Sequence, residues 1–399
     1  MNIAFVYESV LPERGGCETY IADLARLLAV DRHETHLYAC RWDAKALPQG
    51  MRFHPIAPVG GPRFLRPWRF AGRALRVMAG HAHDATIGFD KTFGQDILYP
   101  LGGLHSASFD HNLRKHKSKL TRGLTRLLKT FDLAHWSFKR LERTQYLGPY
   151  DSQIVVNSDM VRRHFAEYLG ISEDDIRVVP SAIDPGRFVQ HDRLRLRAAG
   201  RERWKIAPEH VVGLFVGKNP RLKGLPPLLN AMRRLIDRPE FNGRPPRLRL
   251  LVCGNDDTRP FEREARRLGI RDYVRFAGDY GDIRSAFFSA DFLVHPTFYD
   301  PCSLVVLEAL ACDLPVITSR FNGAAELLHP LQEGFVIDDP HDAERLAWSL
   351  LQMLDPARRR LCAEAARRTS AQWNFERHYQ QMLEVFHDVA ARKRRRLSA

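Results

Sequence analysis

Short apolar runs alternate along this chain with longer segments in which apolar residues recur at helical spacing. The first run, residues 2–7, precedes a turn that contains Gly15 and Gly16 and an apolar-periodic helix that includes Tyr20. Further runs of the strand type lie at 34–39, 85–89, 97–101, 153–157, 176–180, 211–216, 248–254, 290–295 and 314–318. Strands that alternate with helices predict parallel sheets, so the expected fold class is α/β.

Two acids follow the run at 290–295 and form the most informative motif. Asp300 lies in the loop after the strand, and Glu308 lies on a segment with apolar residues at helical spacing. The first turn of such a helix offers unpaired backbone N–H groups and a partial positive charge, which suit a phosphate. The two acids could then hold hydroxyl groups on both sides of a diphosphate. A loop acid and a surface helix acid are the alternative interpretation.

This strand, loop and helix with seven residues between two acids resembles the acid-x7-acid motif of retaining GT-B glycosyltransferases. The usual first acid is Glu, and Asp300 is one methylene shorter. Within that superfamily the chain is most similar to the lipopolysaccharide core glucosyltransferases. The resemblance implies that Asp300 contacts hydroxyls of the donor sugar and that Glu308 contacts those of the ribose. The N–H groups of Cys302, Ser303 and Leu304 would then bind the diphosphate.

The loop after the run at 211–216 combines glycines with cations. It reads Gly217-Lys218-Asn219-Pro220-Arg221-Leu222-Lys223-Gly224. The cations suit a diphosphate, and the loop resembles the Gly-Arg…Lys-Gly loop of the same family. The resemblance implies that Lys223 binds the donor phosphates and acts in catalysis, while Lys218 and Arg221 both stay candidates for the second cation. A basic surface turn is the alternative.

The first half of the chain offers two further candidates. The loop with Gly15 and Gly16 lacks the G-x-G-x-x-G pattern, which disfavours a nicotinamide enzyme. In the family this loop faces the donor phosphates and the acceptor, so Gly16 is a donor-binding candidate, with a plain turn as the alternative. His105 follows the run at 97–101 and resembles the catalytic-site histidine of several family members. The alternative is one ordinary histidine among 17.

A chain of 399 residues is long for one core, so two domains are expected. The resemblance implies a GT-B fold, in which two Rossmann-like domains face each other across a cleft. Residues 1–180 are expected to form the acceptor-side domain and 181–370 the nucleotide-sugar-binding domain. A helix at 371–390 would cross back to the first domain, and the basic tail at 391–399 is expected to be disordered.

Basic residues outnumber acidic ones by 61 to 47, which gives a net charge of +14. Nucleic acid, an anionic membrane and a phosphorylated substrate are all partners that such a charge attracts. Residues 114–131 carry seven Lys and Arg and no acid beside an apolar side. That side consists of Leu120, Leu124, Leu127, Leu128 and Phe131. This pattern is typical of an interfacial helix on an anionic membrane. The alternative is a core-packed helix with a solvated basic side.

Six cysteines without a C-x-x-C pair indicate reduced thiols in a cytosolic chain. The N-terminus lacks the basic region of a signal peptide, and no run approaches the ~18 apolar residues that span a bilayer. We therefore expect a cytoplasmic protein associated with the inner face of the cytoplasmic membrane. No His or acid cluster stands at metal-ligand spacing, so neither a metal nor a cofactor is expected.

The resemblance implies a retaining hexosyltransferase with UDP-glucose or a similar nucleotide sugar as donor. The acceptor would be a saccharide, in particular a lipid-linked one such as lipopolysaccharide core, and nucleic acid is not an expected partner. One alternative is a nucleotide-sugar epimerase on the same fold. Another is a non-catalytic protein that binds an anionic membrane or nucleic acid, which explains the charge but leaves Asp300 and Glu308 without a purpose.

Overall fold

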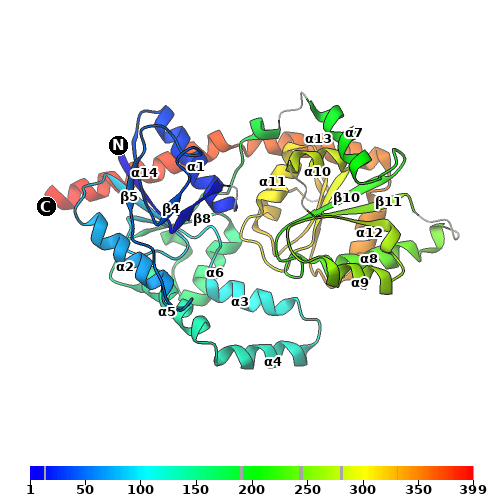
Figure 1. The fold of residues 1–399 in the computed structure, drawn as a ribbon, viewed down its shortest axis with the longest axis horizontal. Helices are drawn as coiled ribbons and strands as arrows, with labels where there is room; N and C mark the ends of the chain where they lie inside the picture. The colour runs from blue at the N-terminus through cyan, green and yellow to red at the C-terminus, as the bar shows by residue number, and fades with distance from the viewer. Residues whose placement is uncertain (13–14, 189–191, 242–245, 279–281, 330, 399) are drawn as a thin grey trace. The chain divides into compact units, whose positions relative to one another are not determined.

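The computed structural model describes residues 1–399 apart from 13–14, 189–191, 242–245, 279–281, 330 and 399 (Figure 1). The chain divides into two compact units. The first unit comprises Met1–Leu113, Ser118–Pro180 and Glu376–Ala399. The second unit comprises Arg114–Lys117 and Ser181–Phe375.

The first unit is built on a parallel sheet with the order β5-β3-β1-β6-β7-β8-β9. Its central strands are almost fully buried, which accounts for their uninterrupted apolar runs. The strands are β1 (Asn2–Val6), β3 (Glu34–Ala39), β5 (Arg52–Pro55), β6 (Ala85–Phe89), β7 (Ile97–Tyr99), β8 (Gln153–Val156) and β9 (Ile176–Val178). The short strands β2 (Ser9–Val10) and β4 (Arg41–Trp42) pair beside this sheet.

The second unit repeats the arrangement with a parallel sheet of order β12-β11-β10-β13-β14-β15. The strands are β10 (Val211–Val216), β11 (Leu248–Cys253), β12 (Val274–Gly278), β13 (Phe292–His295), β14 (Val316–Ser319) and β15 (Gly334–Ile337). The strands predicted from apolar runs are thus found in both sheets, and the predicted α/β class is confirmed.

Helices connect the strands in both units (Figure 1). Those of the first unit are α1 (Gly16–Val30), α2 (Arg66–Met78), α3 (His105–Arg114), α4 (Lys119–Thr130), α5 (Leu133–Leu147) and α6 (Asp159–Leu169), with α14 (Phe375–Ser398) at the end of the chain. Those of the second unit are α7 (Arg193–Arg203), α8 (Leu225–Ile236), α9 (Arg259–Arg267), α10 (Ile283–Ser289), α11 (Leu304–Ala311), α12 (Ala343–Gln352) and α13 (Pro356–Gln372). No described helix is long and apolar enough to span a bilayer.

Each sheet reverses its direction of growth beside its first strand. In the first unit β1 pairs with both β3 and β6, and in the second β10 pairs with both β11 and β13. Ligands of such sheets bind beyond the carboxyl ends of the strands at this reversal. The topology therefore directs attention to the loops after β1 and β6 in one unit and after β10 and β13 in the other.

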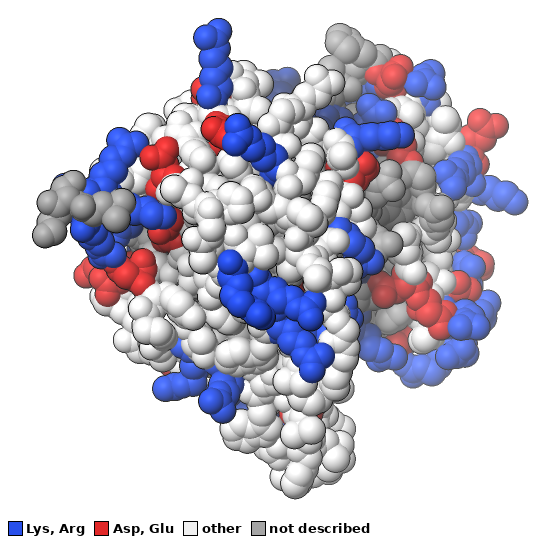
Figure 2. Space-filling model, turned by 60° about the vertical axis from the view of Figure 1, so that its left-hand side comes forward, with Lys and Arg blue, Asp and Glu red and all other residues white. Residues whose placement is uncertain are grey.

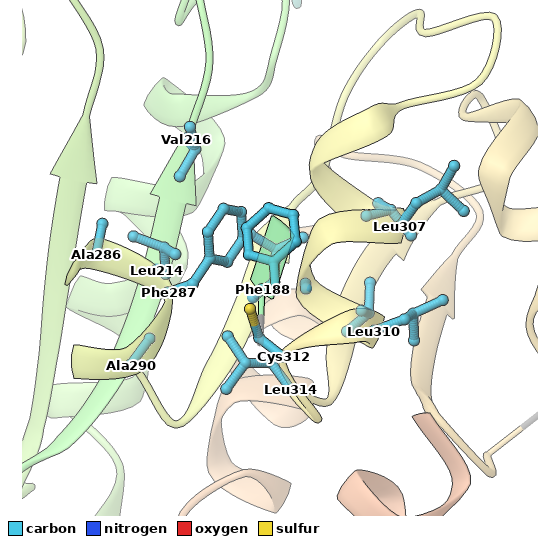
Figure 3. Close-up of a cluster of buried hydrophobic side chains, with 14 of the residues drawn as sticks. Phe188, Leu214, Val216, Ala286, Phe287, Ala290, Leu307, Leu310, Cys312 and Leu314 are labelled. Carbon is cyan, nitrogen blue, oxygen red and sulfur yellow. The ribbon is translucent and has the colours of Figure 1, made fainter. Parts of the chain in front are cut away.

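A buried cluster fixes α11 onto the second sheet (Figure 3). Side chains from β10, α10 and α11 surround Phe188 and Phe287, whose ring centroids lie 5.7 Å apart in an edge-to-face contact. Leu307 and Leu310 supply the apolar side of α11 to this cluster. The helical spacing that predicted α11 is thus the spacing of its buried side, and the polar residue Glu308 lies between the two leucines.

Two expectations about basic segments are wrong. Residues 114–131 do not form one helix, because the backbone at Ser118, a favoured N-cap residue type, is extended (φ −77°, ψ 132°) and separates α3 from α4. Residues 391–398 of the tail are helical as part of α14, and residue 399 lies outside the described residues. Its cations have acidic partners within the first unit: Lys393 lies 3.0 Å from Asp96 and Arg394 lies 3.1 Å from Asp84.

Candidate active site

The loop between β13 and α11 holds Asp300 against the loop that follows β10. The Leu222 carbonyl accepts hydrogen bonds from the Phe298 N–H at 2.8 Å and from the Thr297 hydroxyl at 3.2 Å. On its other side, the Asp300 N–H donates to the Phe321 carbonyl at 2.9 Å. The two contacts to Leu222 join the loop after β13 to the loop after β10 at the sheet reversal, and the contact to Phe321 fixes Asp300 to the segment after β14.

An ion pair lies at this junction. Lys223 Nζ is 2.5 Å from Asp300 Oδ2, and the side chains are only 19% and 13% exposed. Burial by itself raises the pKa of Asp300, but the positive charge of Lys223 and a contribution from His295 outweigh it and hold that pKa well below its ordinary value. Asp300 is therefore an ionised carboxylate with one oxygen committed to Lys223.

Gly224 makes the approach of the two loops possible. Its φ of +86° lies in the left-handed region, and a Cβ built there would stand 2.0 Å from the Pro296 carbonyl oxygen. No larger residue fits without moving one loop away from the other. The glycine next to Lys223 therefore sets the short distance between that lysine and Asp300.

The two remaining cations of this loop have different surroundings. Arg221 places its guanidinium carbon 5.5 Å from the centre of the Phe261 ring on α9. Lys218 is exposed and adjoins Asn219, whose N–H donates to Asp256 at 2.9 Å and so fixes the loop to the segment after β11. Lys218 and Arg221 both stay predictions for the second cation.

The N-terminus of α11 adjoins Asp300. Ser303 is the N-cap residue, and its N–H donates to Asn322 Oδ1 at 3.1 Å. Asn322 also accepts from the Ala324 N–H at 3.1 Å. In this structure the Ser303 amide is therefore engaged. The proposed contacts from the N–H groups of Cys302 and Leu304 to a phosphate stay predictions, as does that of Ser303.

Glu308 lies one turn into α11 and is partly buried. Burial raises its pKa from an ordinary 4.5 to about 7, although the positive charge of Arg187 opposes the shift. A carboxyl group in this setting is protonated in a large fraction of molecules near neutral pH. A carboxyl group beside an apolar cluster lowers the stability of the fold, and an ionisable group with a shifted pKa is typical of a functional position.

His295 is a site residue that the sequence did not indicate. It is fully buried at the end of β13, and its Nε2 lies 3.6 Å from Asp300 Oδ2. Within the described part of the chain, neither ring nitrogen has a hydrogen-bond partner. The only sequence signal was a histidine that ends an apolar run immediately before the motif, and the run itself suggested nothing beyond a buried strand.

A separate cavity of about 510 Å³ lies in the first unit, beyond the carboxyl ends of β1 and β6. Its lining includes both acids and cations, together with His105 at the start of α3. The charged residues are Glu8, Glu18, Arg41, Arg66, Asp90, Lys91 and Glu142. A cavity that mixes both charges with hydroxyl and amide groups suits a polyhydroxylated ligand.

The predicted His105 thus lies in a cavity. Its Nε2 lies 3.3 Å from His135 Nδ1. Burial and then the neighbouring His135 lower the pKa of His105 to about 4, so the ring is neutral at neutral pH. Glu142, which the sequence did not indicate, anchors the start of α3 because it accepts hydrogen bonds from the Ser106 hydroxyl at 2.5 Å and from the Ser106 N–H at 3.2 Å.

Gly16 is the first residue of α1 and is exposed. Part of the predicted loop around it, Glu13 and Arg14, lies outside the described residues. The structure places Gly16 and His105 in the first unit and the remaining predicted site residues in the second. Across the described residues, no group of three or more His, Cys, Asp or Glu side chains gathers in a metal-binding arrangement.

Comparisons with known proteins identify the family. Residues 14–187 match the model described as Glycosyltransferase Family 4, and residues 197–369 match that of glycosyl transferases group 1. The D-inositol 3-phosphate glycosyltransferase of Salinispora tropica is 30% identical over 97% of this chain and 83% of its own length. The chain is a group 1 glycosyltransferase.

Further similarities confirm the predicted resemblance and the GT-B fold of this glycosyltransferase. The lipopolysaccharide glucosyltransferase WaaG of Escherichia coli is 24% identical over 92% of this chain and 93% of its own. A crystal structure of WaaG superimposes with a TM-score of 0.78 at 22% identity, covering 96% of this chain and 99% of the other. HepE of Anabaena, solved in complex with UDP, has a TM-score of 0.70 at 17% identity, covering 97% and 100%.

The raised pKa of Glu308 gives this glycosyltransferase a pH-dependent stability. The folded-state pKa of about 7 exceeds the ordinary value of 4.5, so the folded protein loses stability as pH rises between these values. Glu308→Gln removes the ionisation. We expect the variant to have a higher melting temperature than the parent at about pH 8, with the advantage shrinking progressively towards about pH 4.5. Thermal unfolding across this range measures it, and an advantage that does not change with pH would contradict the assignment.

Proposed function

We propose that this glycosyltransferase transfers a hexose from a UDP-sugar to a saccharide acceptor with retention of anomeric configuration. The observation that carries the proposal is the pair of Lys223 and Asp300, which meets at the sheet reversal beside the N-terminus of α11. The cation and the helix N-terminus suit the negatively charged diphosphate of a nucleotide sugar. The carboxylate can accept hydrogen bonds from its hydroxyl groups.

The donor would be bound mainly by the second unit. Lys223, together with Lys218 or Arg221 and with amides of the first turn of α11, neutralises the diphosphate, while Asp300 accepts hydrogen bonds from hydroxyls of the transferred sugar. Glu308 accepts them from the ribose. The complexes of HepE with UDP and with UDP-glucose support a uridine nucleotide as the donor class.

In the proposed mechanism the enzyme stabilises the leaving group and supplies no nucleophile of its own. As the sugar departs, negative charge grows on the diphosphate, and Lys223 stabilises that charge. The departing phosphate then accepts the proton of the acceptor hydroxyl on the same face of the sugar, which retains the configuration. We propose that these cations take the role that a divalent metal has in other transferases, so that neither a metal nor a cofactor is required.

The acceptor would bind in the cavity of the first unit. Its acids and hydroxyl groups suit sugar hydroxyls, and the neutral His105 ring, whose Nε2 contacts His135, still offers Nδ1 to a ligand there. The similarity to the lipopolysaccharide glucosyltransferase WaaG supports a lipid-linked saccharide and a role in building the cell envelope. Nucleic acid is not part of the proposal.

A panel of nucleotide sugars tests the proposed function. The protein, kept in EDTA, is incubated with each donor and with lipid-linked core saccharides, and free nucleotide is measured. We expect UDP release from a UDP-hexose, greatly increased by the acceptor and unaffected by EDTA. Interconversion of two sugars without acceptor would identify an epimerase. Activity that appears only when magnesium or manganese replaces EDTA would refute the metal-free mechanism.

Lys223→Met tests the leaving-group role. Loss of a charge-assisted contact of about 1.5–3 kcal/mol predicts a decrease in kcat of about tenfold to a hundredfold. The substitution also leaves Asp300 without its cation, which lowers the melting temperature.

The double variant Lys223→Met/Asp300→Asn is the matched control. Without the unpaired carboxylate it should recover most of the melting temperature, yet transfer should stay slow. A double variant that recovers both stability and turnover would show that Lys223 serves the fold alone.

Helix α4 carries the proposed membrane contact. None of its residues is buried, and its apolar side is open to solvent, which rules out a core-packed helix. Leu120 and Phe131 are 81% and 80% exposed, and Leu133 and Trp136 on α5 extend the apolar surface. Figure 2 shows the lowest part of the molecule, where Figure 1 places α4, as a surface with few charged side chains.

The basic residues around α4 are partly neutralised. Arg126 lies 2.7 Å from Asp110, and Lys129 lies 2.5 Å from Asp132. These two acids lie just outside residues 114–131 and offset part of the positive charge of that segment. The exposed apolar side would enter the bilayer interface, and the remaining cations would contact anionic headgroups. We propose that this surface holds the enzyme at the inner face of the cytoplasmic membrane.

Vesicle binding tests this surface. Each basic residue near an anionic bilayer contributes roughly 1 kcal/mol, so Lys119→Gln/Arg122→Gln should weaken binding to phosphatidylglycerol vesicles about thirtyfold. Arg367→Gln/Arg368→Gln on α13 removes the same charge elsewhere and should bind like the parent. Leu124→Ser/Leu128→Ser should also weaken binding. Equal loss in both charge variants, or equally tight binding of the parent to neutral vesicles, would contradict a charge-guided contact.

A further inference from the structure

His295 is the buried group that the proposed donor contacts leave unexplained. Its ring packs against Phe215, with centroids 6.0 Å apart, and the residue is fully buried. Among the described residues, no hydrogen-bond partner meets either ring nitrogen. A buried polar atom without a partner costs roughly 1–3 kcal/mol, and native proteins retain few of them. An imidazole with two such atoms beside a catalytic carboxylate therefore needs an explanation.

Two acceptors lie beside the ring. Nε2 is 3.6 Å from Asp300 Oδ2, slightly beyond hydrogen-bonding distance, and the Val216 carbonyl also favours the protonated ring. A neutral imidazole carries one N–H, whereas an imidazolium carries two. Only the protonated ring can donate to both acceptors. In the ligand-free protein Lys223 already occupies Asp300 Oδ2 at 2.5 Å, so the carboxylate has no need of a second donor.

A bound diphosphate changes this balance. Its negative charge competes for Lys223, and any movement of the ammonium group towards the phosphates leaves Asp300 as a carboxylate in a largely buried site without its cation. A poorly hydrated charge of this kind is strongly unfavourable unless another donor replaces the lost one. Among the described residues, His295 lies next to Asp300 Oδ2 and has a ring nitrogen that can donate a hydrogen bond to it.

We propose that donor binding exchanges the partner of Asp300 from Lys223 to His295, and that His295 takes up one proton from solvent in the exchange. The inference rests on the proposed function, because it requires a diphosphate at Lys223. The proton comes from a buffer acid, joins the lone pair of the imidazole, and is shared with Asp300 in a hydrogen bond. His295 is thus a positioning residue: it holds the carboxylate that in turn orients the sugar.

The charges around the ring agree with this direction. Burial holds the pKa of His295 below its ordinary value in the ligand-free protein; Asp300 opposes that shift and the positive charge of Lys223 reinforces it. Asp300 and Lys223 are the charged side chains that act on this ring among the described residues. Departure of Lys223 removes one downward influence and leaves the upward influence of Asp300, so protonation becomes easier.

The first test needs no nucleotide sugar. Lys223→Met mimics the departed ammonium, and histidine-selective NMR titration of the ligand-free protein follows the His295 ring, assigned with His295→Gln or, should that variant fail to fold, His295→Asn. We expect the His295 pKa to rise by at least about one unit in Lys223→Met, and to fall back in Lys223→Met/Asp300→Asn. An unchanged His295 pKa in Lys223→Met would overturn the proposal, as would protonation of the Asp300 carboxyl in place of the ring.

The second test measures the proton directly. UDP-glucose has no phosphate group that titrates near neutral pH, so calorimetry in buffers of different ionisation enthalpy reports protons taken up by the protein. We expect uptake approaching one proton in the parent and in His210→Gln, a control histidine before β10, but little uptake in His295→Gln. Affinity should accordingly fall as pH rises. Binding with undiminished uptake in His295→Gln would overturn the proposal.

The two tests separate the inference from the proposed function. A pKa rise in Lys223→Met without any binding of UDP-glucose would support the partner exchange and count against this donor. Binding of UDP-glucose without any pKa rise would support the donor and refute the exchange.

Discussion

The contact between Lys223 and Asp300 is the constraint on which the second unit's site depends. It requires two loops to meet beyond the ends of β10 and β13, and the left-handed Gly224 and the hydrogen bonds to the Leu222 carbonyl bring them together. The ion pair also neutralises a carboxylate that would be costly alone in this largely buried place. The same lysine is therefore the stabilising partner of Asp300 and, in the proposed mechanism, the ligand of the leaving group.

Two further residues of the second unit, Glu308 and His295, lie in surroundings that are unfavourable for stability. Glu308 keeps a carboxyl group beside an apolar cluster, and His295 keeps two ring nitrogens without partners. In the proposed complex, ribose hydroxyls would contact Glu308, and movement of Lys223 to the diphosphate would leave Asp300 as the partner of His295. We propose that these costs to stability are offset by the contacts that a bound donor would make.

Much of the fold could be predicted from periodicity, because parallel strands buried on both sides give continuous apolar runs and their order with helices is regular. Asp300, Glu308 and Lys223 could be proposed because their residue types and order match a known chemistry. His295 could not, since it ends an apolar run and its role depends on Asp300 in the next loop and on Lys223 in the loop after the neighbouring strand β10. The helical tail was missed because its acidic partners, Asp84 and Asp96, lie about three hundred residues earlier in the chain. The break at Ser118 was missed because helical periodicity continues across it.

A crystal structure of the complex with UDP-glucose would show where the Lys223 ammonium group lies when the donor is bound. We expect Nζ to leave Asp300 Oδ2, now 2.5 Å away, for the diphosphate, while Asp300 turns to hydroxyls of the glucose and His295 moves to hydrogen-bonding distance of Asp300. A complex in which Lys223 still holds Asp300, with the diphosphate bound by other residues, would contradict this expectation.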